Sequence, residues 1–320
     1  MSGFTNAIIV LALAILIDLI LGEPPLRIHP TVWMGKLINR GIGNANGLSA
    51  HLQKIYGAAL ALGTIVLFTG TSCLILWVAD IFGEPIQILC AALLLKSTFS
   101  IRLMYTYSST LAFAIKRGDW AEARRILQYI VRRDPNSLTG SQVISAGVES
   151  VAESTMDGIT SPLLFYAIFG VPGAVAYRTI NTLDSMLGYK NPPFMNVGWF
   201  SAKLDSIANW LPARLTAILT LASAASIGLS ASDGLRILRR DRNRTESWNA
   251  GWVMSAMAGA LKVQLEKPGA YVLGDPDEAL THNHILKATH ILAINTILFI
   301  LLIVIPIILG AQSLSGVIKH

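Results

Sequence analysis

Charged residues are scarce in this 320-residue sequence: Asp, Glu, Lys and Arg together make up 14% of it, whereas hydrophobic residues make up 53%. Soluble globular domains carry about 25% charged residues, so the composition excludes an ordinary soluble enzyme and predicts an integral membrane protein. Only two cysteines occur, Cys73 and Cys90, both inside apolar segments. They exclude a disulfide framework and a cysteine zinc site, and we expect both thiols to be buried.

Sequence signatures of several function classes are also missing. The chain has no Walker loop, no dinucleotide fingerprint, no serine nucleophile elbow and no CxxC pair. Three histidines near the C-terminus, His282, His284 and His290, lack the i, i+4 spacing of a zinc-binding helix. No nucleic-acid motif accompanies the net charge of +6, so we expect no nucleic-acid partner.

Long apolar runs predict an all-α polytopic membrane protein. Four runs are long enough to cross a hydrocarbon core of about 30 Å: Phe4–Leu21, Tyr56–Val78, Pro85–Ile101 and Thr289–Gly310. Two weaker apolar runs, Pro162–Tyr177 and Leu215–Leu229, are expected to be re-entrant or packed within protein. The alternative is that both cross the membrane and place Arg178–Pro212 outside. The first of them is interrupted at Gly170-Val171-Pro172-Gly173.

Basic residues predict the orientation of the helices. Eight Lys or Arg residues fall between Lys96 and Arg133 against two acids, and five Arg residues fall between Arg236 and Arg244. Cytoplasmic loops are rich in Lys and Arg, so we expect both regions in the cytoplasm and both termini outside. The expected organisation is one membrane-embedded domain, with N-terminal spans in 1–101, a cytoplasmic-side region with two partly embedded helices in 102–288 and a C-terminal span in 289–320.

One segment of this basic region, Lys116–Arg133, reads as an amphipathic surface helix that ends at Asp134-Pro135. Its basic face is expected to rest on anionic membrane lipid, and the alternative is that it binds substrate.

Three acids, Glu149, Glu153 and Asp157, stand four residues apart. In a helix each step of four residues advances about 40° and about 6 Å, so the three carboxylates are expected to line one face. No basic residue lies within one turn of them in the sequence, and Mg²⁺ with phosphate is the natural counter-charge for such a row. The alternative is a solvated face of an amphipathic helix. Thr139 or Ser141 is the expected N-cap.

Further polar residues gather beside the apolar runs. Arg178, Asn181 and Asp184 share a helical face, with Gly188 as the expected C-cap. A buried polar network is the alternative to a functional role for them.

A second group follows: Asp205 and Asn209 are spaced i, i+4, Lys203 lies nearby, and Arg214 begins the next helix. Charged groups so close to apolar segments are either functional or tightly paired. Asn249 precedes a helix of small residues. We expect its side chain either to cap this helix or to bind substrate.

The order of these clusters resembles the adenosylcobinamide-phosphate synthases, the CbiB/CobD proteins of cobalamin biosynthesis. The resemblance covers nearly the whole chain and rests on these segments: Asp18, Gly22–Pro25, His29-Pro30, Met34-Gly35, Glu149, Glu153, Asp157-Gly158, Pro162-Leu163, Asn181–Tyr189, Gly198–Arg214 and Asn249–Leu261. The chain departs from the family where it has Trp248, usually Pro, and Ser154, usually Asn.

The resemblance implies an enzyme: an ATP- and Mg²⁺-dependent acid–amine ligase of the inner membrane with its active site on the cytoplasmic side. It would join adenosylcobyric acid, through its free propionate, to aminopropanol phosphate or a close amino-alcohol phosphate, with ATP expected to activate the carboxylate as an acyl phosphate. The alternative is a corrinoid transporter or a non-catalytic membrane scaffold. A further rival is a membrane-embedded lipid-phosphate transferase.

On this reading, Glu149, Glu153 and Asp157 hold Mg²⁺ and nucleotide. The remaining roles are assigned by residue type: Asp184 and Asp205 are second catalytic candidates; Arg178, Lys203 and Arg214 bind phosphates; Asn181, Asn209 and Asn249 orient substrate amides; His29 also contacts substrate. Helix faces of small residues favour a homo-oligomer or association with other enzymes of the corrinoid pathway.

Overall fold

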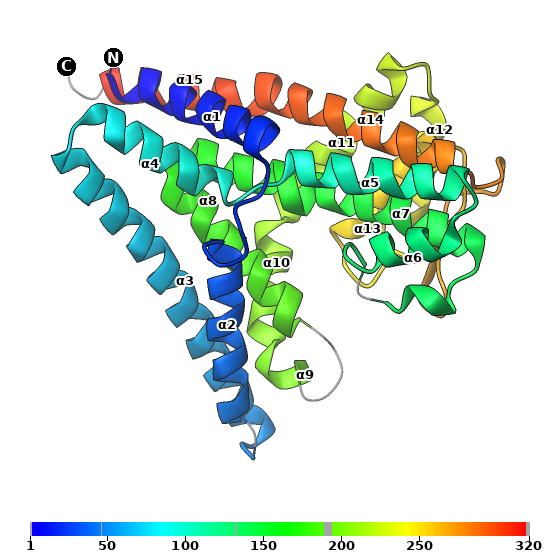
Figure 1. Cartoon of the computed structure of the whole chain (residues 1–320), viewed down its shortest axis with the longest axis horizontal. Helices are drawn as coiled ribbons and strands as arrows, with labels where there is room; N and C mark the ends of the chain where they lie inside the picture. Colours follow the sequence, from blue (N-terminus) through cyan, green and yellow to red (C-terminus); the bar gives the residue numbers. More distant parts are fainter. Residues whose placement is uncertain (1, 46, 132, 189–193, 318–320) are drawn as a thin grey trace. The chain divides into compact units, whose positions relative to one another are not determined.

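The computed structural model of the chain describes residues 2–45, 47–131, 133–188 and 194–317 (Figure 1). Within these ranges the elements are helices, apart from one antiparallel two-stranded hairpin. The residues form two compact units, unit 1 from Met1–Ser100, Ser161–Ala208 and Leu302–His320, and unit 2 from Ile101–Thr160 and Asn209–Leu301. The all-α polytopic fold is therefore confirmed, and the hairpin is an addition that the sequence reading did not predict.

Unit 1 is assembled around one long helix, α8 (Ser161–Leu187), against which α2, α3, α4, α10 and α15 pack. The other elements are α1 (Ser2–Leu21), α2 (Pro30–Ile42), the short η1 (Gly43–Ala45), α3 (Ala50–Ile81), α4 (Glu84–Lys96), α9 (Phe194–Val197), α10 (Trp199–Ala208) and α15 (Ile305–Val317). Ile38, Ala61, Leu183 and Leu187 form a buried apolar cluster that joins α2, α3 and α8. Burial of such side chains contributes about 1.5–3 kcal/mol each.

Helix α8 is broken where the sequence predicts a break. Gly170 has φ 70° and ψ −165°, which a residue with a side chain rarely adopts. Pro172, two residues on, has no backbone N–H to donate. The predicted interruption of Pro162–Tyr177 is thus confirmed.

Among the described residues, four helical runs are long and apolar enough to cross a membrane: Ala50–Ile81, Glu84–Lys116, Gly140–Leu187 and His282–Ala311. The number of spanning runs agrees with the prediction, but the segments that form them differ. Asn6–Leu21 is a shorter apolar helix, and the acid-bearing segment joins the weak run Pro162–Tyr177 in one helical run of 48 residues. Periodicity could not reveal this continuity because polar residues separate the two segments.

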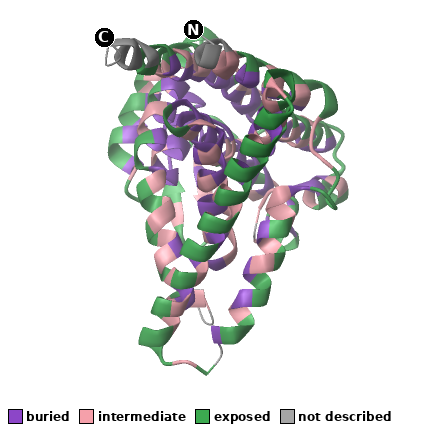
Figure 2. Cartoon of the chain, turned by 90° about the vertical axis from the view of Figure 1, so that its left-hand side faces the viewer, coloured by how far each residue is buried: buried purple, intermediate pink, exposed green. Residues whose placement is uncertain are grey.

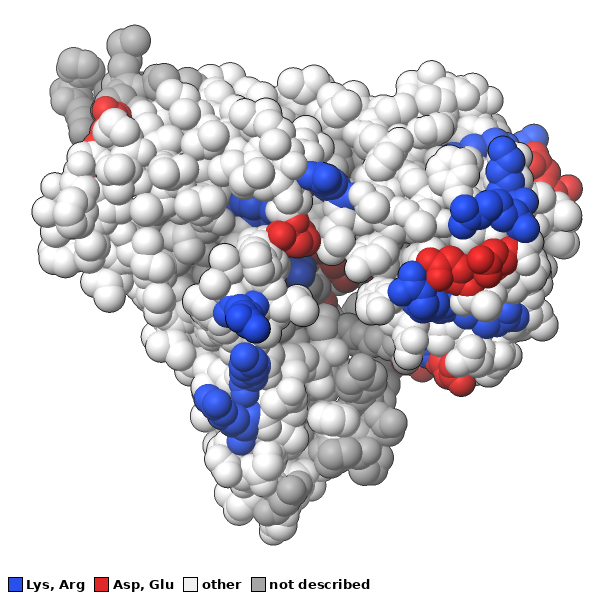
Figure 3. Space-filling view, viewed as in Figure 1, with Lys and Arg blue, Asp and Glu red and all other residues white. Residues whose placement is uncertain are grey.

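Helix α3 shows the membrane character of unit 1 most clearly. Only 17% of its most apolar window is buried, and large side chains such as Val66, Leu67 and Trp77 are exposed (Figure 2). Over the middle of α3 the visible face carries no charge (Figure 3). Cys73 is exposed on this helix, so its predicted burial was wrong, although both cysteines are free as expected. An apolar side chain that avoids water by facing lipid need not be buried in protein.

Unit 2 is assembled around α7 (Gly140–Thr155), of which eleven of sixteen residues are buried. Helices α5, α6, α13 and α14, the strand β1 and the π-helical turn η3 (Met156–Thr160) pack against it. The elements are α5 (Ile101–Lys116), α6 (Trp120–Leu127), η2 (Pro135–Ser137), α11 (Trp210–Ser226), α12 (Ala231–Asp241), α13 (Ala250–Ala260), β1 (Leu265–Lys267), β2 (Tyr271–Leu273) and α14 (His282–Phe299). A second π segment, η4 (Ile300–Val304), follows α14 and crosses from unit 2 into unit 1.

Two local features of unit 2 differ from the sequence reading. The predicted helix Lys116–Arg133 is wrong in its bounds, because Gly118 has φ +74° and Asp119 caps a shorter helix, α6, through Glu122 N. Strands β1 and β2 pair in register, with Leu265 opposite Leu273. The expected single embedded domain stays a prediction, and only the first boundary between the compact units, after residue 100, lies near an expected one.

Candidate functional site

The acid-bearing helix α7 begins at a complete capping box. Thr139 Oγ1 accepts a hydrogen bond from Gln142 N, and the Gln142 side chain accepts one from Thr139 N. The expectation that Thr139 or Ser141 caps the helix is confirmed for Thr139. Such a cap contributes about 1 kcal/mol and fixes where the helix starts, and hence which side chains point inward.

Glu149 is the most constrained carboxylate of the predicted row. It is 6% exposed, and both oxygens accept from Arg133 Nη2, at 3.2 and 3.1 Å. Ser145 Oγ donates to it at 2.6 Å and Tyr271 Oη at 2.8 Å. A buried carboxylate is tolerated only when it is paired and hydrogen-bonded. Arg133, sixteen residues earlier in the chain, supplies the positive charge next to Glu149 that is missing from the neighbouring residues of the sequence.

Tyr271 stands on the first residue of β2 and closes this cluster from the side of the hairpin. Burial raises the pKa of the Tyr271 hydroxyl well above its usual value, and the negative charges of Glu149 and Glu153 raise it further. The hydroxyl therefore stays protonated and donates its hydrogen to Glu149.

The three acids of the row do not share one environment. Glu149 is buried, Glu153 is exposed one turn later, and Asp157 is half-buried in η3. A π-helical turn has i→i+5 bonds, so the i, i+4 alignment does not continue past Thr155.

Magnesium remains an expectation at these residues. In the described part of the chain no group of three or more His, Cys, Asp or Glu side chains is placed to hold a metal ion by itself. Mg²⁺ is usually held by only one or two carboxylates together with substrate phosphates. Glu153 is exposed and Asp157 is half-buried, so these two carboxylates are the candidates for that donor set. Glu149 is buried, and its oxygens accept from Arg133, Ser145 and Tyr271.

Two other predicted residues of unit 2, Arg214 and Asn249, are brought into direct contact. Arg214 Nη1 donates to Asn249 Oδ1 at 2.8 Å and to Trp210 O at 2.7 Å. Asn249 is 3% exposed and makes no side-chain cap, and Ser247 Oγ accepts from Ala250 N instead. Asn249 thus holds the N-cap position of α13 (Ala250–Ala260), as one of the two predicted options has it, but its side chain makes no capping hydrogen bond.

The remaining predicted residues are distributed between the two units. Asn209 is buried at the start of α11 in unit 2 and makes no side-chain cap. Unit 1 holds the other five: Arg178, Asn181 and Asp184 on α8, and Lys203 and Asp205 on α10.

Within unit 1, Asn181 is buried, Arg178, Asp184 and Asp205 are half-buried, and Lys203 is exposed. Helices α8 and α10 pack against each other, so these two sets belong to one packed pair of helices. The helix α8 ends at Leu187, so Gly188 follows it as expected.

His29 makes structural hydrogen bonds, which is the alternative that the sequence offers to a contact with substrate. Its Nδ1 accepts from Thr31 N at 3.2 Å and so caps α2, which leaves Nε2–H to donate to Glu23 at 3.0 Å. Both ring nitrogens are thus engaged within unit 1. The expected contact of His29 with substrate stays a prediction.

Glu23 also accepts from Lys96 Nζ at 3.0 Å, and Lys96 pairs with Asp18 at 2.9 Å. Burial by itself raises the pKa of Glu23, but hydrogen bonds from His29 and Lys96 outweigh it and hold the pKa below its usual value. Lys96 interrupts an apolar run in the sequence, and this network explains how it is accommodated.

Sequence reasoning missed Arg133, Ser145 and Tyr271 around Glu149. The hairpin that carries Tyr271 did have a signal, because Pro268-Gly269 separates two short runs of strand-forming residues. Arg133 had no comparable signal, since only the tertiary fold brings it to α7.

Comparison with known proteins covers both units. The family described as CobD/Cbib protein matches residues 11–298. The chain belongs to the CobD/Cbib family. This confirms the resemblance, and members of this family carry the name cobalamin biosynthesis protein. The chain is 40% identical over 292 residues to the probable cobalamin biosynthesis protein CobD of Methanothermobacter thermautotrophicus, with 91% of this chain and 95% of the relative covered.

Two further relatives are also named CobD. The cobalamin biosynthesis protein CobD of Dehalococcoides mccartyi is 37% identical over 273 residues, covering 84% of this chain and 87% of that protein. The probable cobalamin biosynthesis protein CobD of Thermoplasma acidophilum is 35% identical over 314 residues, covering 96% and 99%. No solved structure matches the chain.

Proposed function

We propose that this CobD/Cbib family member is an ATP- and Mg²⁺-dependent acid–amine ligase at the cytoplasmic face of the inner membrane. It joins the free propionate of adenosylcobyric acid to the amine of aminopropanol phosphate or a close amino-alcohol phosphate. The observation that carries the proposal is α7, which holds the buried Glu149 against Arg133 and presents Glu153 one turn later, in a chain otherwise poor in charge. The relatedness to proteins named for cobalamin biosynthesis supplies the substrate class.

The chemistry explains why anionic groups must be gathered. A carboxylate is a poor acyl donor, so one of its oxygens takes the terminal phosphoryl group of ATP and ADP leaves. The amine then attacks the acyl carbon, the amide C–N bond forms, phosphate leaves and the amine loses a proton. Both steps bring a carboxylate or an amine phosphate close to other negative charge, which cations must offset.

The residues of the chain divide this task. Glu153 and Asp157 would hold Mg²⁺, which lowers the repulsion between the nucleotide and the substrate carboxylate when bound. Glu149, fixed by Arg133 and Tyr271, keeps α7 and hence Glu153 in place.

The other predicted residues keep their assigned roles. The phosphate-binding candidates are Arg178, Lys203 and Arg214, the amide-orienting candidates Asn181, Asn209 and Asn249, and the secondary acids Asp184 and Asp205.

The test is a complete reaction with the purified protein in detergent. ATP, Mg²⁺, adenosylcobyric acid and aminopropanol phosphate are supplied, and mass spectrometry of the corrinoid is expected to show the amide product. Omitting any one substrate should abolish it. A corrinoid transporter or scaffold would show no corrinoid-dependent ATP hydrolysis. A lipid-phosphate transferase would not depend on aminopropanol phosphate.

A further inference from the structure

Unit 2 contains two arginines that share one aromatic ring. The Arg214 guanidinium lies 4.7 Å from the centre of the Trp252 ring, and the Arg242 guanidinium lies 5.0 Å from the same centre. Arg214 also lies 4.6 Å from the centre of the Trp210 ring. Both arginines are half-buried. We call Arg214 and Arg242 the arginine pair.

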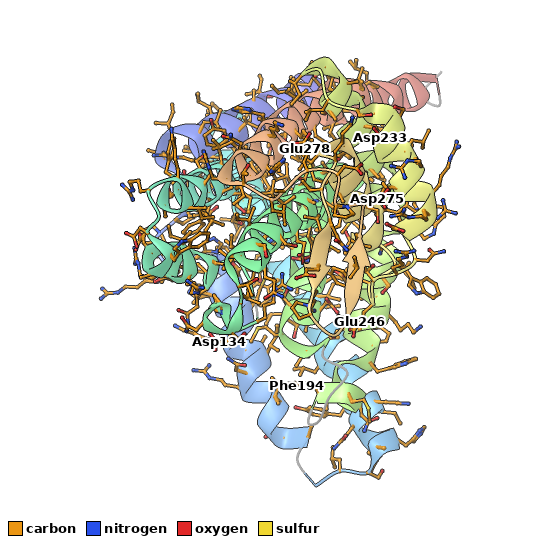
Figure 4. All side chains as sticks on the ribbon, turned by 90° about the vertical axis from the view of Figure 1, so that its right-hand side faces the viewer. Asp134, Phe194, Asp233, Glu246, Asp275 and Glu278 are labelled. Carbon is orange, nitrogen blue, oxygen red and sulfur yellow. The ribbon has the colours of Figure 1, made fainter. Side chains whose placement is uncertain are left out.

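The arginine pair has no acidic partner among the residues that the structure describes, because neither guanidinium forms an ion pair there. Two other arginines close to Arg242 in the chain, Arg236 and Arg244, do form ion pairs. Arg236 binds both Asp233 and Asp275, which lie on one side of unit 2 in Figure 4, and Arg244 binds Asp241.

Two like charges held together without a counter-charge repel. Burial lowers the pKa of Arg214, and the positive charge of Arg242 lowers it further. An anion from outside the chain would relieve this repulsion.

The fold assembles the pair before any ligand arrives. A Cβ on Gly251 would lie 2.2 Å from Arg242 O and 2.6 Å from Thr245 Oγ1, so only glycine lets the turn after α12 lie on the start of α13. This approach brings Arg242 to Trp252. Asn249, buried beside it, accepts from Arg214 and fixes the direction of that guanidinium.

We propose that the arginine pair on Trp252 is a metal-independent binding site for a phosphate monoester dianion. Two guanidinium charges match the two charges of such a phosphate, and their planar N–H groups suit its oxygens. The cluster contributes no carboxylate that would recruit Mg²⁺, in contrast to α7.

The inference rests on the proposed function in assigning this phosphate to the amino-alcohol phosphate, while the triphosphate and its Mg²⁺ are assigned to Glu153 and Asp157. What it adds is Arg242, Trp252 and the independence from metal.

The first experiment measures kinetics in the full-length protein in detergent. Arg242→Gln is expected to raise the KM for aminopropanol phosphate about tenfold or more, because a charged hydrogen-bond donor is lost, and to leave the KM for ATP unchanged. Arg239→Gln is the matched control, since it removes the same charge from an exposed position on α12 and should behave as wild type. A rise in the KM for ATP instead, or equal effects of both variants, would overturn the proposal.

The second experiment needs no turnover. Tryptophan fluorescence is followed while inorganic phosphate, and separately aminopropanol phosphate, is added in the presence of EDTA. Wild type should respond to both, and Arg242→Gln and Arg214→Gln should respond at least tenfold more weakly, while circular dichroism shows that each variant is folded. Loss of the wild-type response in EDTA would show a metal-dependent site and refute the proposal.

A lipid headgroup also carries a phosphate, so the titration is repeated in nanodiscs with and without phosphatidylglycerol. A response to phosphate that is the same in both supports a site for free phosphate. A response that requires the lipid refutes it.

The two proposals fail separately. Metal-independent binding through the arginine pair without any amide product would keep this site and remove the ligase. If Arg242→Gln forms the amide with a wild-type KM for aminopropanol phosphate, the ligase proposal stands and the phosphate site at the arginine pair is refuted.

Discussion

Units 1 and 2 each bury a charge, but they surround it differently. In unit 1, Lys96 forms an ion pair with Asp18 and donates hydrogen bonds to Glu23 and to the carbonyl of Phe99, and this network lies among apolar helices. In unit 2, Glu149 is equally well held, but the next acid on α7, Glu153, is exposed. A closed network of charges holds helices together, whereas an accessible acid or an arginine without an acid can accept a ligand. The comparison therefore separates a charge network with a structural role at Lys96 from the magnesium site that we propose next to Glu149.

Lys96→Met should have the largest effect on stability. It leaves the buried Asp18 without the counter-charge of Lys96, which costs about 3–5 kcal/mol. We expect the variant to melt at a much lower temperature in detergent, or not to accumulate in the membrane.

Adding Asp18→Asn and Glu23→Gln to the Lys96→Met variant should recover part of the loss, because no charge then remains unpaired. Unchanged melting of the single variant would break the comparison, since the network would then not hold unit 1 together.

Glu153→Gln should have the largest effect on activity with little effect on folding. The exposed carboxylate contributes little to packing, so the melting temperature should stay near that of wild type. Ligase turnover should fall by about 100-fold or more, the scale seen when an electrostatic group is removed from a reacting centre. Wild-type turnover would remove Glu153 from the proposed magnesium site.

Tyr271→Phe should have a smaller effect, on both stability and activity. It removes one donor from Glu149 and leaves the ring in place, which costs about 1 kcal/mol of stability. Activity should fall less than in Glu153→Gln, because Arg133 and Ser145 still hold the carboxylate. Thermal melting measures the loss of stability, and ligase turnover with the KM for Mg²⁺ measures the loss of activity. A fall in turnover as large as that of Glu153→Gln would place Tyr271 at the reacting centre.

The pH dependence at Glu23 should be the smallest effect. Its folded-state pKa lies below its ordinary value of 4.5, so its contribution to stability is complete above about pH 4.5 and is lost as the pH falls through the folded pKa. Stability in detergent between pH 3 and pH 5 should therefore fall less steeply in Glu23→Gln than in wild type. Identical slopes would show that Glu23 does not titrate with folding.

The sequence indicated many local features correctly. The apolar runs predicted a polytopic helical protein, Thr139 predicted a cap and Gly170 predicted a break. These succeed because each depends on residues close together in the chain. The bounds of α6 and the membership of the four long runs were missed because a glycine with positive φ, and the joining of two segments into one helix, are decided by the packing around them.

The candidate site was only half visible from the sequence. The acids of α7 and the contact residues Arg214 and Asn249 could be found from their types and spacing, and the family followed from the order of the clusters. The sequence therefore determined that this is a membrane protein of cobalamin biosynthesis with an acid-bearing helix. Only the tertiary structure decided that Arg133 and Tyr271 tie down Glu149 and that Arg242 joins Arg214 on Trp252. Spacing along a helix fixes which residues share a face, but contacts between distant segments depend on how the helices pack.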